Sequence, residues 1–127
     1  MKEQVERHRL VLTWIEHVKK HCETGRVPDS TFWAVEKLWE IRDNDPDLCW
    51  ELILEILSVD QSPAVIENLA AGPLEDLLDK HGPRVIDRVE AQAKTNPLFK
   101  DLLGGVWRST IAQPIWDRVQ AVAGERW

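Results

Sequence analysis

The amino-acid sequence predicts an all-α protein, a compact bundle of about eight short helices, on three observations. Apolar residues recur at intervals of three and four, the spacing that places them on one face of a helix. No run of alternating β-branched residues marks a strand. Six of the seven prolines follow a residue that can cap a helix or make a turn. Proline suits the first helical position because the N–H it lacks would be unpaired there.

The first half of the chain predicts three helices, at about 2–23, at about 30–42 and from Pro46 onward. Gly25 suits a left-handed stop after the first helix, and Asp45 suits the cap before Pro46. The third helix has the widest apolar face and is expected to lie centrally. The residues expected on the three apolar faces are Val11, Trp14, Ile15, Val18 and Cys22; Phe32, Val35, Leu38, Trp39 and Ile41; and Cys49, Leu52, Ile53, Ile56 and Leu57.

The stretch LAAGPLEDLLDKHGP, residues 69–83, carries Gly-Pro twice within one short segment. Glycine adopts the left-handed conformation that ends a helix, and proline begins the next one. We therefore expect three short helices at about 63–71, 73–81 and 83–95, joined by tight corners at Gly72-Pro73 and Gly82-Pro83.

Two further helices are expected in the last third of the chain, one from Pro97 to Gly104-Gly105 and one from about Pro114. Residues 1–127 have the usual length of one domain, so we expect a single all-helical domain. Short antiparallel helices with tight corners favour a right-angled bundle or a piece of HEAT-like helical-repeat packing. No exact sequence repeat decides between the two.

The composition excludes several classes of protein. The net charge of −6 and the lack of a dense Lys/Arg tract argue against nucleic-acid binding, because the field repels phosphate groups. No apolar run approaches the ~20 residues needed to cross a bilayer, and no export signal is visible in MKEQVERHRL. Cys22 and Cys49 fall on predicted apolar faces and are expected as buried free thiols. We predict a cytoplasmic protein.

Three separated motifs carry a family resemblance: AGPLEDLL followed by HG, the upstream DNDPDLCWELI, and the downstream PLFKDLLGGVW. Together they resemble a family of uncharacterised bacterial proteins known only as a domain of unknown function, with an AGPLEDLL–HG core and tryptophans on either side. The resemblance covers roughly residues 30 to 120. It implies a small helical domain and brings no activity, substrate or cofactor.

Glu75, Asp79 and His81 are the candidate catalytic or ligand-binding residues. Glu75 and Asp79 are four apart and share a helix face, and paired carboxylates can act as acid and base. We favour a structural role for these acids over a catalytic one, because acids in the first turn of a helix are stabilised by the helix dipole. His81, on the leucine face, is interpreted as a buried histidine at a corner.

No metal or other cofactor is predicted. His17 and His21 have the i, i+4 spacing of some zinc ligands, but HVKKH lacks the glutamate of HExxH and no second ligand pair follows. Asp43, Asp45 and Asp47 resemble the start of a calcium loop, and the comparison fails at Leu48 and Leu54, where glycine and glutamate are needed. Phosphate-binding and nucleophile-elbow motifs are also missing.

The seven tryptophans, with no tyrosine, are the most unusual feature. Trp33 shares its helix face with Glu36, Lys37 and Glu40, where an indole is more typical of an interface than of solvent. Trp107 follows Gly-Gly in a predicted connection. The structural alternative is that neighbouring helices cover both indoles.

The leading functional hypothesis is a non-enzymatic protein-interaction domain with an acidic, tryptophan-bearing surface formed by Trp33, Glu36, Glu40 and Trp107. Its expected partner is a basic protein, and one version is an immunity or antitoxin-like role, since acidic helical domains suit steering to cationic sites. A small enzyme or ligand-binding domain centred on Glu75, Asp79 and His81 is the alternative. Self-association through the tryptophan surface is a third hypothesis.

Overall fold

The computed structural model describes residues 2–127, and it confirms the all-α prediction, with no strand in that range. Because α4, the π-helical turn η1 and α5 follow one another without a break, the elements form six continuous helices where about eight short ones were expected. The elements are α1 (Lys2–Thr24), α2 (Phe32–Asn44), α3 (Pro46–Val59), α4 (Pro63–Leu69), η1 (Ala70–Leu74), α5 (Glu75–Thr95), α6 (Pro97–Leu103) and α7 (Gln113–Val122).

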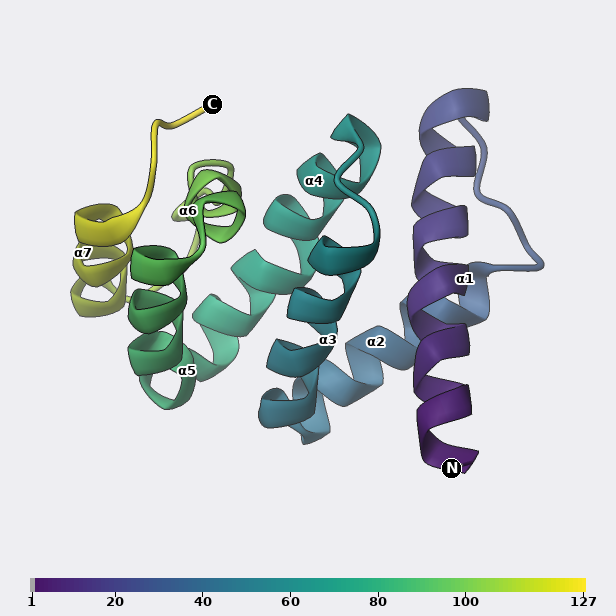
Figure 1. The fold of residues 1–127 in the computed structure, drawn as a ribbon, viewed down its shortest axis with the longest axis horizontal. Coiled ribbons are helices and arrows are strands. Elements are labelled where there is room, and N and C mark those ends of the chain that lie inside the picture. The colour runs from purple at the N-terminus through teal and green to yellow at the C-terminus, as the bar shows by residue number, and fades with distance from the viewer. Residues whose placement is uncertain (1) are drawn as a thin grey trace.

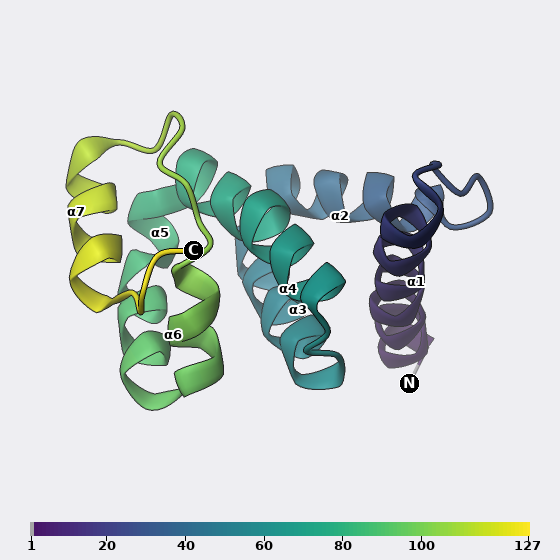
Figure 2. The same cartoon turned by 90° about the horizontal axis from the view of Figure 1, so that it is seen from above.

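The helices are arranged in a row that starts with α1 and ends with α6 and α7 (Figure 1). Seen from above, α2 extends from α1 toward α5 (Figure 2) and contacts α1, α3 and α5. One continuous cluster of buried apolar residues runs from α1 to α7. The widest apolar face belongs to α3, which contacts α1, α2, α4 and α5 and thus lies centrally, as its sequence predicts.

Proline marks the first turn of four helices, as expected. Asp45 caps α3 by accepting a hydrogen bond from the N–H of Leu48 at 3.1 Å, and Asn96 caps α6 in the same way through Leu98. Ser62 precedes Pro63 but its side chain makes no cap bond. Gly25 ends α1 with a positive φ of 72°, which confirms the predicted left-handed stop.

The prediction of a left-handed corner at each Gly-Pro is wrong. Neither Gly72 nor Gly82 has a positive φ. Pro73 lies inside η1, where the wider turn accommodates a ring that would clash with the preceding turn of a regular α-helix. The second Gly-Pro does produce a kink, located at His81, whose φ of −133° and ψ of 28° are not helical.

Two residues assigned to the core lie outside it. Trp39 is 46% exposed, and Cys22 is exposed near the end of α1. Both occupy the edge of an apolar stripe, where small differences in helix rotation decide burial. Trp14, Trp50 and Trp116 are buried as predicted, and so is Cys49.

Candidate functional site

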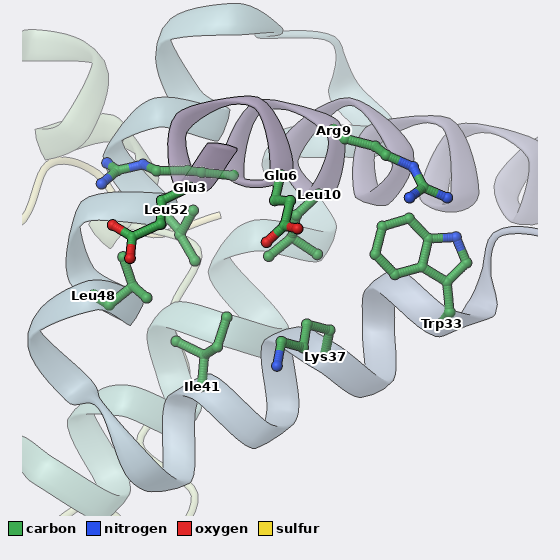
Figure 3. Close-up of a pocket in the computed structure, with 10 residues that line it drawn as sticks. Glu3, Glu6, Arg9, Leu10, Trp33, Lys37, Ile41, Leu48 and Leu52 are labelled. Carbon is green, nitrogen blue, oxygen red and sulfur yellow. The ribbon is translucent and has the colours of Figure 1, made fainter. Parts of the chain in front are cut away.

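A groove opens on the surface where α1, α2 and α3 meet (Figure 3). Its volume is about 320 Å³. Leu10 and Leu52 are buried and form its floor, while Ile41 and Leu48 are half-buried and widen the apolar lining. A concave apolar surface with a few polar groups at its rim is the usual form of a binding site.

Trp33 lies at one end of the groove, beneath the side chain of Arg9 from α1 (Figure 3). The guanidinium carbon of Arg9 is 4.8 Å from the centroid of the indole, which places the cation over the ring face. Lys37 follows one turn later on α2 and also lines the groove. Its ammonium lies 3.5 Å from the carboxylate of Glu40.

The rim carries charges of both signs, two acids (Glu3 and Glu6) and three bases (Arg7, Arg9 and Lys37). Arg7 forms ion pairs with two carboxylates of α3, that of Glu55 at 2.7 Å and that of Glu51 at 3.6 Å. Glu3 and Glu6 project into the groove and form no ion pair within residues 2–127 (Figure 3). Glu3 and Glu6 are therefore free to receive positive charge from outside, whereas Arg9, which also forms no ion pair in that range, lies over the ring of Trp33.

The four residues of the predicted tryptophan surface are not brought together. Trp33 lines the groove, and Glu36 and Glu40 are exposed on α2 outside it. Trp107 lies on the connection between α6 and α7. Those two helices are at the end of the row opposite α1 (Figure 1). It is 64% exposed, and its backbone N–H donates to the carboxylate of Glu75 at 3.0 Å.

The acids of the AGPLEDLL segment hold other parts of the chain. Glu75 accepts from Trp107, and Asp79 accepts from the hydroxyl of Thr110 at 2.8 Å. Burial raises the pKa of the Glu75 carboxyl, and the nearby Asp76 and Asp79 raise it further, against the opposing effect of the Trp107 hydrogen bond. His81 is half-buried at the kink. None of the three candidate residues lines the groove.

A second pocket of about 170 Å³ lies between α1, α2 and the π-helical turn, and its lining includes His17, His21, Trp39, Arg42 and Gly72. The Arg42 guanidinium donates to Asp43 at 3.0 Å and to Asp76 at 2.9 Å. Burial lowers the pKa of His17, and the neighbouring His21 lowers it further. Within residues 2–127, no three His, Cys, Asp or Glu side chains gather closely enough to hold a metal ion by themselves.

Sequence reasoning missed the contribution of α1 to the groove. Arg9 and Glu6 were assigned no role, because nothing in the sequence states which face of α1 meets α2. A usable signal existed, since Glu3, Glu6, Arg7 and Leu10 have the three- and four-residue spacing of one helix face. The ion pair between Arg42 and Asp76, 34 residues apart, had no local signal.

The fold defines the protein as an all-helical domain. The acidic segment that follows its π-helical turn holds neighbouring elements in place. A family model described as a family of unknown function (DUF6869) matches residues 21–126. The chain belongs to this family. No match was found among curated proteins or among solved structures. None of the helices in residues 2–127 has both the length and the apolar character needed to cross a membrane.

Proposed function

We propose that the chain is a non-enzymatic protein-interaction domain that binds a basic, amphipathic segment of another protein in the groove between α1, α2 and α3. The observation that carries the proposal is the pairing of an apolar lining with two unpaired carboxylates, Glu3 and Glu6, at the rim. An amphipathic helix placed in a groove uses this combination of apolar anchors and flanking charge.

The apolar lining supplies the affinity in this proposal. Leu10 and Leu52 are already buried, at 6% and 1% exposure, so they give the groove a fixed floor. Trp33, Ile41 and Leu48 are half-buried and retain apolar surface that a partner would remove from water, at about 25 cal/mol per Å². Trp33 is the expected centre of binding energy, because indoles are enriched among interface hot spots.

In this proposal the charged residues of the domain determine which partners bind. Glu36 adds negative charge along α2, and Glu40 there is paired with Lys37. The unpaired charges of the groove are those of Glu3 and Glu6 and, at the Trp33 end, that of Arg9. The chain as a whole carries −6, so a basic partner is attracted over distance as well as in contact. An immunity or antitoxin-like role, in which the partner is a basic enzyme, is the narrower form of the proposal.

A display library of 20-residue helical peptides with Lys or Arg on the polar face, matched to one with Glu, tests the proposal. The wild-type chain should enrich basic peptides that have an apolar face. The double variant Glu3→Lys/Glu6→Lys should lose them, and the matched variant Glu16→Lys/Glu23→Lys, with the same charge change on α1 outside the groove, should retain them. The enriched peptides should bind more weakly as salt is raised.

Localisation of the peptide provides the second readout. Binding should shift the indole signal of Trp33 in NMR spectra and leave that of Trp107 unchanged. Failure to enrich basic amphipathic peptides, or equal binding by both charge variants, would contradict the proposal. The same holds if Trp33→Ala leaves the affinity unchanged.

A further inference from the structure

The unpaired charges of the groove are separated along its length (Figure 3). Glu3 lies beside Leu48 at one end, and Glu6 follows one turn later on α1. Arg9 lies at the other end, with its guanidinium carbon 4.8 Å from the centroid of the Trp33 ring. All three charged side chains are exposed, and none forms an ion pair within residues 2–127. The groove is therefore negative at one end and positive at the other.

The other charges of the rim have partners inside the chain. Arg7 pairs with Glu55 and Glu51 of α3. The ammonium of Lys37 lies 3.5 Å from the carboxylate of Glu40. A segment that enters the groove thus meets two unpaired acids at one end and one unpaired base at the other.

The separation of the two ends fits a short helix. Glu3 and Arg9 are six residues apart on α1, which corresponds to about 9 Å along the helix axis. Leu10 and Leu52 form the apolar floor and Ile41 widens it. In a partner helix, residues seven positions apart share a face and lie about 10 Å apart along the axis. A basic residue and a carboxylate at this spacing therefore reach both ends while apolar residues between them cover the floor.

We propose that the groove binds a helix with segregated charges. Its basic residues lie over Glu3 and Glu6, and a carboxylate about seven residues away in the partner lies beside Arg9. This inference rests on the proposed function and adds the order of the charges to it. Arg9 pairs with that carboxylate while staying over Trp33, because a guanidinium donates hydrogen bonds in its plane and stacks through its face.

The order of the charges matters because the opposite placement is repulsive at both ends. A lysine beside Arg9 and a carboxylate beside Glu3 each meet a like charge. A helix with segregated charges reaches the favourable order in one of its two directions along the groove, whereas a helix with alternating charges reaches it in neither. Exposed ion pairs are individually weak, but several contacts change together, so we expect at least about a tenfold difference in affinity at low salt.

Three fluorescein-labelled 20-residue peptides with the same apolar face test the proposal by fluorescence anisotropy on the full chain. The first peptide has lysines in one half and glutamates in the other, the second has the same residues in alternation, and the third has lysines only. The segregated peptide should bind at least about tenfold more tightly than the alternating one. The difference should shrink as salt is raised to about 0.5 M.

Substitutions at Arg9 test the positive end of the groove. Arg9→Glu should remove the preference for the segregated peptide over the alternating one and should strengthen binding of the lysine-only peptide. Arg9→Lys retains the charge and should retain the preference. Lys20→Glu makes the same charge change on α1 outside the groove and is the matched control. Arg9 and Lys20 are exposed, and circular dichroism establishes that each variant is folded.

A nitroxide on the peptide gives an independent readout of its placement. On the lysine half it should broaden the amide signal of Leu48, and on the glutamate half the indole signal of Trp33. Equal binding of the segregated and alternating peptides, a preference that survives Arg9→Glu, or the reversed pattern of broadening would overturn this inference, while binding of the lysine-only peptide would still support the proposed function. If none of the three peptides binds, both fail. A dimer in sedimentation that shields Trp33 would assign the groove to a second copy of the chain and would also overturn the inference.

Discussion

Substitution of the two glycines of the Gly-Pro pairs by alanine should have unequal effects on stability. A Cβ atom at Gly82 would lie 2.9 Å from Cγ1 and 3.0 Å from Cγ2 of Ile115 on α7, whereas a Cβ at Gly72 would have nothing within 4 Å apart from its own helix backbone and its two neighbours in the chain. The branch carbons of isoleucine are close to its backbone and stiff, so α7 itself must move. Overpacking of this kind costs about 1–3 kcal/mol.

The net magnitude follows from two opposing effects. Alanine gains roughly 0.5–1 kcal/mol over glycine within a helix, and neither glycine has a positive φ. Gly82→Ala should therefore lower the free energy of unfolding by about 1–2 kcal/mol. Gly72→Ala should cost about 1–3 kcal/mol less than Gly82→Ala, because both alanines meet the ring of the following proline and only the one at position 82 also meets Ile115. Urea denaturation, followed by tryptophan fluorescence and circular dichroism, measures both.

A double-mutant comparison assigns the cost to Ile115. Ile115→Ala removes every atom within 3.4 Å of the added Cβ, so the combined variant should be destabilised by at least about 1 kcal/mol less than the sum of the single changes. Ile115→Val keeps Cγ1 and Cγ2, so it should reduce the destabilisation caused by Gly82→Ala only slightly. If Gly82→Ala is as stable as Gly72→Ala, the close packing of α5 on α7 is not as described here.

Three further predictions concern thiols, the α6–α7 connection and pH. Cys22 should react with a thiol reagent in the native protein while Cys49, whose pKa burial raises to about 12, should react only after unfolding. Glu75→Ala removes the acceptor of the Trp107 N–H and should increase hydrogen exchange of that amide about fivefold, for a bond worth roughly 1 kcal/mol, with the Leu102 amide in α6 as the control. The pKa of His17 is lower in the folded chain than its ordinary value of 6.5, so the unfolded chain takes up the proton first and the free energy of unfolding should decrease as pH falls through 6.5, then level off below the folded pKa. His17→Gln should remove this dependence between pH 7.5 and 5.5, and His8→Gln should not.

The sequence was sufficient for the helix starts at Pro46, Pro63, Pro97 and Pro114, because these depend on local chemistry, whereas the expected starts at Pro73 and Pro83 lie inside helical segments. Asp45 and Asn96 cap the helices that the following prolines begin, and the apolar stripe of α3 identified the central helix. Gly72-Pro73 could not be interpreted correctly from local preference alone. A Gly-Pro pair fits both a helix end and a π-helical turn, and the packing of neighbouring helices decides between them.

The candidate sites depended on contacts between distant residues, and for that reason were only partly visible. The sequence did predict that Trp33 lies on a polar helix face, because the residues three and four positions away are charged. The Arg9 side chain above the indole comes from another helix and could not be predicted in this way. The i, i+4 spacing of His17 and His21 was likewise visible in the sequence. The oxygen atoms that orient them belong to Arg26 and Thr31, in the chain that connects α1 to α2.

The acidic residues that follow the π-helical turn are better explained as supports than as catalysts. Asp76 binds Arg42 of α2, Glu75 binds the backbone of Trp107, and Asp79 binds Thr110. Each acid thus holds a segment at least 31 residues away in the chain. Each contact uses one oxygen of its carboxylate, and none of the three acids lines the groove. Since these contacts fix both α2 and the α6–α7 connection against α5, substitution of these acids should alter the positions of Trp39 and Trp107 before it alters any chemistry.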